Sequence, residues 1–254
     1  LGLYSYSTKI PDGQLPDSLG GFFMFIAEPN PGSTAEVIKK VFTLILDRSG
    51  SMSGTKITQA KNAAKFIVNN LNEGDKFNIV DFESNVYNFR NNHVLYSIQN
   101  RDSALTHINN INAGGGTNIS GAFSTAVPQF NVANDSTANI IIFLTDGMAT
   151  VGITNTPQLL THVYNLIEST ETEIFLYSFG IGTDVDQQLL TLMSSQNNGY
   201  AEFLLNEELE TRITNFYLRI KNPVLLSPEI TFSSPFINNV YPEPLQNLYI
   251  GQQM

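Results

Sequence analysis

Five oxygen-bearing side chains, drawn from three places in the sequence, have the types and the spacing of a metal site. They are, in chain order, Asp47, Ser49, Ser51, Thr117 and Asp146. Two carboxylates and three hydroxyls are donors that hard divalent cations accept in proteins. The two carboxylate charges balance one dication, and five donors leave one octahedral position for water or for a carboxylate from a partner. The sequence therefore predicts a site for Mg²⁺, with Mn²⁺ or Ca²⁺ as further candidate ions.

Two strand-like segments are expected to position these five predicted donors. The apolar run at 41–46 ends at Asp47, and the apolar run at 140–144, within a predicted strand at 139–144, is followed by Thr145-Asp146. Continuous apolar runs of this length are typical of parallel strands that are buried on both faces. Ligands of open α/β sheets bind at the carboxyl ends of the strands, and the glycines at 114–116 let the backbone approach closely. The alternate spacing of Asp47, Ser49 and Ser51 predicts that their side chains converge on one side of the turn.

Strand and helix patterns alternate between residues 36 and 221. Strand patterns occupy 41–46, 76–82, 86–90, 139–144, 173–179 and 200–205, and helical patterns occupy 57–71, 103–111, 119–127, 156–167, 184–193 and 207–220. This alternation predicts an α/β fold: a doubly wound, mostly parallel sheet with helices on both faces. Local signals add boundaries: we expect Gly74 to end the first helix, Asn118 and Thr156 to cap helices, and Pro128 to end or kink one.

The two ends of the chain interrupt this alternation. Short apolar alternations at 22–27, 229–232 and 247–250 predict antiparallel strands. Because domain termini tend to lie close together, residues 1–35 and 222–254 are predicted to form one small β-rich unit beside an α/β domain at 36–221. The chain has no starting Met and no basic N-terminal region, so we expect it to be a fragment of a longer protein.

The composition argues against several classes of function. The chain has 254 residues, of which 42% are hydrophobic and 14% charged, which is typical of a globular domain. Its net charge of -10 disfavours nucleic acid as a partner. The absence of cysteine excludes disulfides, thiolate zinc sites and cysteine nucleophiles. The apolar runs are too short to span a bilayer, so no membrane insertion is expected within this chain.

Each piece of the predicted site also has an ordinary structural interpretation. Asp-x-Ser-x-Ser can form a capped turn, Gly-Gly-Gly-Thr a hinge, and Thr-Asp-Gly a simple turn. Their joint occurrence at matching strand ends favours the metal site. The segment 114–117 lacks the Gly-Lys-Ser/Thr of a phosphate-binding loop, and Asp184 and Asp186 are better explained as a helix cap than as a second metal site. The histidines lie in unrelated segments without ligand spacing; they are His93, His107 and His162.

The run 41–53 followed by a helix, then by Thr117 and Asp146, resembles a von Willebrand factor A domain over about residues 36–221. The five predicted donors match its metal-ion-dependent adhesion site, or MIDAS, position by position. A narrower resemblance to inter-alpha-trypsin inhibitor heavy chains is found in Phe179–Asp186, Asn198–Ala201, Phe216–Tyr217, Pro223–Leu226, Asn239–Pro242 and Leu248–Gly251. In that family both flanks of the A domain form a β-rich hybrid unit.

The resemblance implies that Ser49, Ser51 and Thr117 contact the metal directly, with Asp47 and Asp146 acting partly through water. It also implies that a partner carboxylate changes these contacts and that the last helix of the domain shifts. A secreted or cell-surface location follows from the same resemblance, and the absence of cysteine suggests a bacterial relative. The proline at 128 departs from the family pattern, in which that helix usually runs on.

Three functions are compatible with the sequence. The first is a binding module, not an enzyme, whose metal captures an Asp or Glu of a protein partner; an open coordination position and the lack of a base–nucleophile pair favour it. The second is metal-assisted hydrolysis of a phosphate ester, which would need a general base and cations near the metal. Arg48 is the only basic residue inside the motif. The third is a purely structural domain of a larger surface protein. The partner's identity and the oligomeric state stay open.

Overall fold

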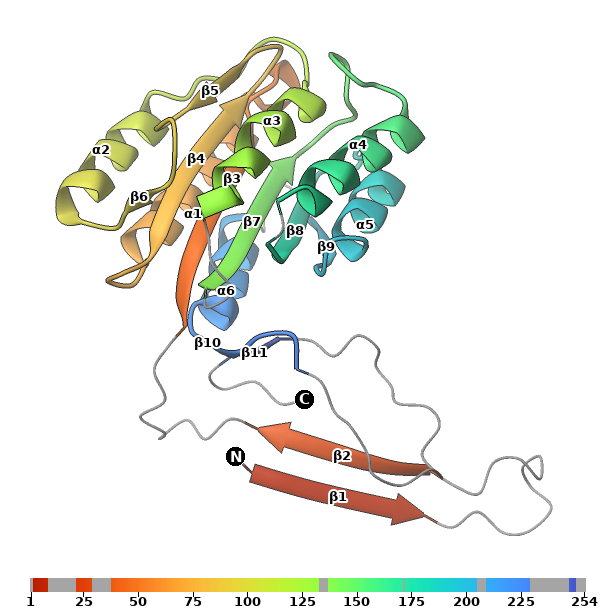
Figure 1. Cartoon of the computed structure of the whole chain (residues 1–254). Coiled ribbons are helices and arrows are strands. Elements are labelled where there is room, and N and C mark those ends of the chain that lie inside the picture. Colours follow the sequence, from red (N-terminus) through yellow and green to blue (C-terminus); the bar gives the residue numbers. More distant parts are fainter. Residues whose placement is uncertain are drawn as a thin grey trace. The chain divides into compact units, whose positions relative to one another are not determined.

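The computed structural model divides the chain into two compact units (Figure 1). One unit is Lys39–Tyr217, and the other combines Leu1–Ile38 with Leu218–Met254. The predicted domain boundaries at residues 35 and 221 stay a prediction. The structure describes residues 2–8, 22–28, 38–132, 137–170, 172–204, 209–228 and 247–249.

The larger unit is built on one open sheet. Among the described residues its strands follow the spatial order β5-β4-β3-β7-β8-β9, and β6 pairs with β4. Strands β3, β4, β7, β8 and β9 run parallel, whereas β5 and β6 are antiparallel to β4. The predicted fold class is confirmed. The strands are β3 (Lys39–Asp47), β4 (Lys76–Phe82), β5 (Val86–Asn88), β6 (Val94–Leu95), β7 (Thr137–Thr145), β8 (Ile174–Ile181) and β9 (Ala201–Leu204).

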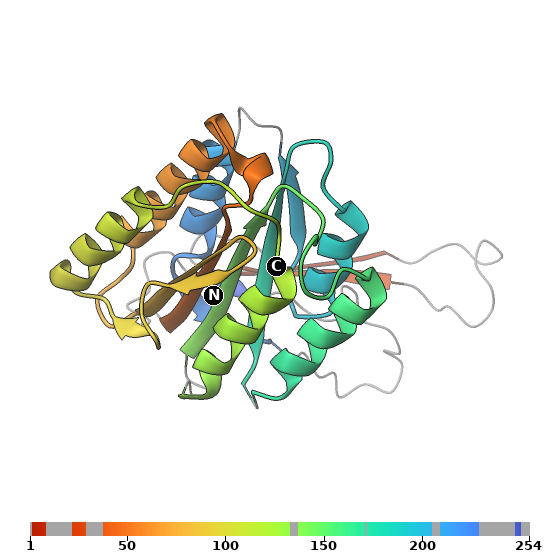
Figure 2. The ribbon, with the colours of Figure 1, turned by 90° about the horizontal axis from the view of Figure 1, so that it is seen from above.

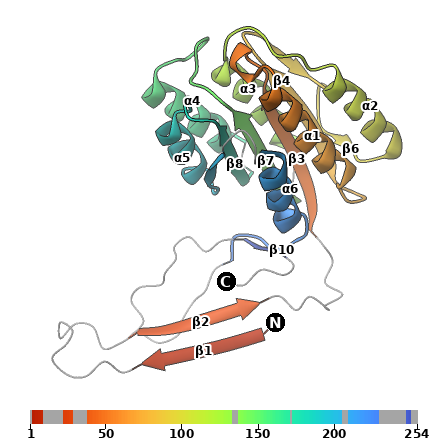
Figure 3. The same cartoon turned by 180° about the vertical axis from the view of Figure 1, so that it is seen from behind.

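Helices cover both faces of this sheet. Figure 2 shows α3, α4 and α5 on one side of the strands, and Figure 3 shows α1 and α6 on the other, with α2 beside α1. In the described parts of the chain, no helix has the length and apolarity that a membrane crossing requires. The helices are α1 (Thr55–Asn69), α2 (Ile98–Asn109), α3 (Ile119–Ala126), α4 (Thr156–Glu168), α5 (Gln187–Ser195) and α6 (Leu209–Ile220), with short 3₁₀ turns η1 (Gly50–Met52) and η2 (Val127–Val132).

Aromatic side chains fasten helices to the two faces of the sheet. Phe143 of β7 meets Phe123 of α3 edge-on, with ring centroids 5.1 Å apart. Phe179 of β8 meets Phe216 of α6 in the same way at 5.0 Å. Since both faces are covered, every residue of β8 is buried, and this burial explains why the strand is mostly apolar. The hydroxyl of Ser178 in this strand accepts a hydrogen bond from Ser194.

The smaller unit contains two short antiparallel pairs. β1 (Gly2–Thr8) pairs with β2 (Phe22–Glu28), and β10 (Pro223–Leu225) pairs with β11 (Leu248–Tyr249). The antiparallel strands predicted at 22–27 and 247–250 are therefore present. The strand predicted at 229–232 lies outside the described residues.

Several predicted helix boundaries are confirmed by the caps that make them. Asn118 caps α3, because its side-chain oxygen accepts from the backbone N–H of Gly121. α3 ends at Ala126, and Pro128 lies in the 3₁₀ turn that follows. Asp186 caps α5, as its interpretation as a helix cap predicts.

Other predicted boundaries are wrong. Gly74 does not end α1; it lies in the turn before β4, at a φ of 90° that favours glycine. α2 begins before the predicted Ser103, because the Ser97 side chain caps an earlier turn. The cap of α4 is Asn155, and Thr156 is already the first helical residue.

Candidate metal centre

The predicted donors lie where β3 and β7 end, at the carboxyl edge of the sheet. From β3 the chain crosses to β4 on one side, and it later returns to form β7 on the other side. Leu46 of β3 is in register with Leu144 of β7, so Asp47 and Thr145 follow directly at the two strand ends. Open α/β sheets bind ligands at such topological switch points.

The Asp47 side chain is completely buried and hydrogen-bonded to neutral groups. One carboxylate oxygen accepts from the Ser49 backbone N–H at 2.7 Å, and the other accepts from the Thr145 hydroxyl at 2.5 Å. Burial raises the pKa of Asp47 to about 6, although these hydrogen bonds act in the opposite direction. Among the described residues no ion pair compensates this carboxylate, so a bound cation would relieve the cost of burying it.

The two serines of the motif meet on one side of the turn that follows β3. Their hydroxyl oxygens, Ser49 Oγ and Ser51 Oγ, are 3.2 Å apart. The predicted convergence is therefore present, but its cause differs from the one expected. The strand ends at Asp47, and the short 3₁₀ turn Gly50–Met52 brings the serines together, rather than the alternation of an extended chain.

Asp146 connects the second strand end to this turn. Its side chain has no exposed surface; Oδ1 accepts from the Ser51 hydroxyl at 2.7 Å, and Oδ2 accepts from the Lys56 ammonium at 2.6 Å. Hydrogen bonds thus connect the two strand ends: the Ser49 backbone N–H bonds to Asp47, and the hydroxyls of Ser49 and Ser51 lead to Asp146. Sequence reasoning missed Lys56. A signal existed, because a cation in the first turn of a helix is disfavoured by the helix dipole unless an acid pairs with it.

The glycine loop is bound to the same turn through its backbone. The N–H of Gly50 donates to the carbonyl of Gly115 at 3.0 Å, and the N–H of Gly114 donates to the carbonyl of Arg48 at 2.8 Å. Thr117 follows this loop and is buried, and its carbonyl accepts from the N–H of Thr150. Within the described ranges, no hydrogen bond joins the Thr117 hydroxyl to the other four predicted donors.

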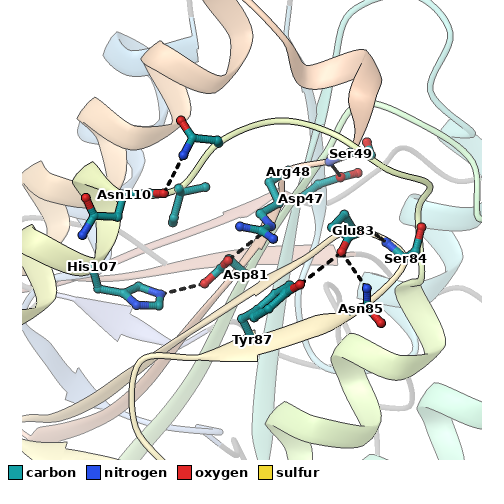
Figure 4. Close-up of polar contacts among 12 residues, drawn as sticks. Asp47, Arg48, Ser49, Asp81, Glu83, Ser84, Asn85, Tyr87, His107 and Asn110 are labelled. Atoms are coloured by element: carbon teal, nitrogen blue, oxygen red, sulfur yellow. Dashed lines mark hydrogen bonds and ion pairs between the residues drawn. The ribbon is translucent and has the colours of Figure 1, made fainter.

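A second polar cluster lies beside the motif (Figure 4). Arg48 Nε is 3.5 Å from the buried Asp81, which also pairs with His107 at 2.6 Å. The Arg48 guanidinium stacks on the Tyr87 ring, with its carbon 4.2 Å from the ring centroid. The only basic residue within the motif is therefore directed towards Asp81 and Tyr87. Sequence reasoning did not find this pairing of Asp81 and His107.

The donor chemistry fits a hard cation. In the described part of the chain, no three His, Cys, Asp or Glu side chains form a metal-binding group. A metal at this edge would therefore be held by two carboxylates supplemented by hydroxyls, which suits Mg²⁺ better than a soft ion. The assignment of the five predicted donors as metal ligands stays a prediction.

Comparison with known proteins places the chain among characterised domains. The family model described as "von Willebrand factor type A domain" matches residues 42–203. The inter-alpha-trypsin inhibitor heavy chain H2 of Mus musculus is 29% identical over 259 residues, covering 99% of this chain and 27% of that protein. The chain thus spans about a quarter of the length of the curated relatives it matches.

Solved structures show the same fold at lower identity. A von Willebrand factor type A protein from Catenulispora acidiphila superposes with a TM-score of 0.65 at 21% identity, covering 74% of this chain and 44% of that chain. Proximal thread matrix protein 1 from the mussel byssus, with a zinc-occupied MIDAS motif, superposes with a TM-score of 0.57 at 15% identity, covering 75% of this chain and 50% of that chain.

Proposed function

The chain belongs to the von Willebrand factor type A domain family, and from this premise we propose that it is a divalent-metal-dependent protein-binding module, not an enzyme. Domains of this family typically bind proteins with the help of a metal. The resemblance to inter-alpha-trypsin inhibitor heavy chains extends over nearly the whole chain and supports the same kind of function. It also supports a secreted or cell-surface location, which we include in the proposal.

In this proposal five side chains hold the ion; they are Asp47, Ser49, Ser51, Thr117 and Asp146. The ion, Mg²⁺ with Mn²⁺ or Ca²⁺ as alternatives, offers one open coordination position to an Asp or Glu carboxylate of a protein partner. The Ser49 N–H and the Thr145 hydroxyl orient Asp47. Ser51 orients Asp146.

One observation carries the proposal: two fully buried carboxylates lie at the ends of two adjacent parallel strands. Asp47 accepts from the Ser49 backbone N–H, and Asp146 accepts from the Ser51 hydroxyl, which lies beside that of Ser49. Asp146 is paired with Lys56, but among the described residues no ion pair offsets the burial of Asp47, which is costly unless a cation is near. The zinc-occupied MIDAS of the mussel byssus protein, which has the same fold, supports an ion at this edge.

The alternative functions have less support. Hydrolysis of a phosphate ester requires cations aimed at the substrate, but Arg48 is directed towards Asp81 and Tyr87. A purely structural domain would leave the burial of Asp47 without a ligand to offset it.

Isothermal titration with Mg²⁺ and with Mn²⁺ tests the proposal. We expect the wild-type chain to bind one ion and Asp47→Ala to bind none. Asp102→Ala is a matched control, since it removes an exposed carboxylate from α2 and should bind as the wild type does. The proposal fails if the wild type binds no ion, or if Asp47→Ala binds as tightly as the wild type.

A further inference from the structure

The Asp146 carboxylate already has a cation supplied by the chain itself. Lys56 Nζ lies 2.6 Å from Asp146 Oδ2; the side chain of Asp146 is fully buried, and that of Lys56 is 22% exposed. The other oxygen, Oδ1, accepts from Ser51, a proposed metal ligand. One oxygen of this carboxylate therefore pairs with an ammonium group, and the other contacts the proposed metal site.

The position of Lys56 in its helix shows that Asp146 is what holds it. Lys56 is the second residue of α1, where the unpaired N–H groups give the helix a partial positive charge that disfavours an ammonium group. A lysine in this first turn is therefore explained by its carboxylate partner and not by the stability of the helix.

A charge count shows what the pair does to the site. Asp47 and Asp146 bring two negative charges, and Lys56 returns one positive charge. A dication on the Oδ1 side of Asp146 would share that carboxylate with the ammonium on the Oδ2 side. At such separations, in a partly buried environment, two cations repel strongly.

We propose that Lys56 is an internal counter-ion of Asp146, which stabilises the metal-free domain and weakens its affinity for divalent metal. This inference rests on the proposed function, because it concerns the affinity of the same site. In this role Lys56 is not a ligand. It keeps one buried carboxylate paired when no ion is bound, and it makes occupancy depend on the free metal concentration.

Titration calorimetry with Mg²⁺ on charge-removing and charge-keeping variants tests the effect on affinity. Lys56→Met keeps an unbranched side chain without the charge, and we expect its dissociation constant to fall at least tenfold. Lys56→Arg keeps the charge and should stay within about threefold of the wild type. Lys65→Met removes one charge from the same helix, further along, and should leave the constant unchanged.

Thermal unfolding in EDTA tests the metal-free half of the inference. Lys56→Met leaves Asp146 buried without its cation, so the melting temperature should fall by roughly 5–10 °C. Saturating Mg²⁺ should raise the melting temperature more in this variant than in the wild type. Lys56→Gln, which can still donate a hydrogen bond to Asp146, gives the same test on affinity if Lys56→Met does not fold.

The possible outcomes separate this inference from the proposed function. The proposed function stands if the wild type binds Mg²⁺ and Asp47→Ala does not. In that case the role of Lys56 is refuted if Lys56→Met, or Lys56→Gln in its place, binds no more tightly than the wild type. Binding by Lys56→Met alone supports the inference and refutes metal binding by the wild type. No binding by any variant refutes both.

Discussion

A buried carboxylate lies near each end of β3, and the two differ in how their negative charge is compensated. At the amino end, Asp75 pairs with Lys40 at 2.7 Å, and neither side chain is exposed. Both Asp75 oxygens also accept backbone N–H groups, from Lys40 and Asn72. At the carboxyl end, Asp47 is buried to the same extent, but its hydrogen-bond donors, the Ser49 N–H and the Thr145 hydroxyl, are neutral. Figure 1 shows β3 passing through the centre of the sheet between these ends.

This difference separates the structural charge of Asp75 from that of Asp47, for which we propose a function. The Asp75 carboxylate has a cation and two hydrogen-bond donors within the fold, so it needs no ligand to compensate its charge. The burial of Asp47 is not compensated by any ion pair among the described residues, and its pKa rises to about 6 as a result. Groups perturbed by burial in this way are concentrated at functional sites.

The largest expected effect on stability comes from the amino end of β3, where Asp75 lies. Asp75→Asn removes the carboxylate charge that lies 2.7 Å from the buried Lys40 ammonium, and breaking such a pair costs about 3–5 kcal/mol of the free energy of unfolding. Asp47→Asn, measured in EDTA, should cost little or add stability, because it removes an uncompensated buried charge. Urea unfolding of both variants measures the difference. Equal losses would contradict the distinction between the two ends.

The pH dependence of stability without metal provides the second test, since the buried Asp47 and the half-buried His93, both near β3, act in opposite directions. His93, hydrogen-bonded to Thr43 of β3, has its pKa lowered to about 4, mainly by burial. Because the unfolded chain binds a proton on histidine more tightly, this group makes stability rise as the pH rises from about 4 to 6.5. For Asp47 the native state binds the proton more tightly than the unfolded chain does. This group therefore makes stability fall as the pH rises from about 4 to 6.

Each shift corresponds to about 3 kcal/mol at most, at 1.36 kcal/mol per pKa unit. The two contributions nearly cancel in the wild type, which should show a flat profile in EDTA between pH 4 and 6.5. Asp47→Asn should lose stability as the pH falls through this window, and His93→Gln should gain it. Urea unfolding at several pH values measures the slopes, and slopes of the same sign in both variants would refute the assignment.

The effect of metal should also be restricted to one end of β3. At a free Mg²⁺ concentration of 100 times the dissociation constant, binding adds about 2.7 kcal/mol to the free energy of unfolding. The wild type and Asp75→Asn should both show this increment, although the second is much less stable, and Asp47→Ala should not. Unfolding in Mg²⁺ and in EDTA gives the increments. If Asp75→Asn showed no stabilisation by Mg²⁺, the two ends of β3 would be energetically coupled.

Much of the fold could be predicted because burial on both faces gives the central strands an unambiguous pattern. β3 and β7 are continuous apolar runs, and their ends were predicted within about two residues. The start of α2 could not be predicted from periodicity, because its first turn has no apolar face: Ile98 is 69% exposed. Only the cap of Ser97 determines where this helix begins.

The donors of the candidate site could be predicted because each lies at a strand end or in a short motif. Their surroundings could not. Lys56 and Asp146 are 90 positions apart, and His107 and Asp81 are 26 apart. Such pairs depend on how α1 and α2 pack near the sheet, which no local pattern records. The contact between the Glu83 carboxylate and Gly115 likewise joins residues that are far apart in the sequence.

The smallest effect concerns the glycine loop at the carboxyl end, where two adjacent glycines form a matched pair. Gly115 has a φ of 74°, and a Cβ there would overlap the Glu83 carboxylate, whereas a Cβ at Gly114 would meet nothing within 4 Å. Gly115→Ala should therefore cost about 1–2 kcal/mol in urea unfolding, and Gly114→Ala about 0.5 kcal/mol or less.

Glu83 cannot move aside freely, because hydrogen bonds hold it in place. The Asn85 side chain and the Ser84 N–H donate to it, and these bonds, with Asn85 first, lower its pKa to about 2. Adding Glu83→Ala to Gly115→Ala removes the overlap but not the backbone strain, so the double variant should lose less than the sum of the single losses. Additive losses would place the cost in the backbone alone. Equal costs for Gly114→Ala and Gly115→Ala would mean that the loop has no fixed conformation to strain.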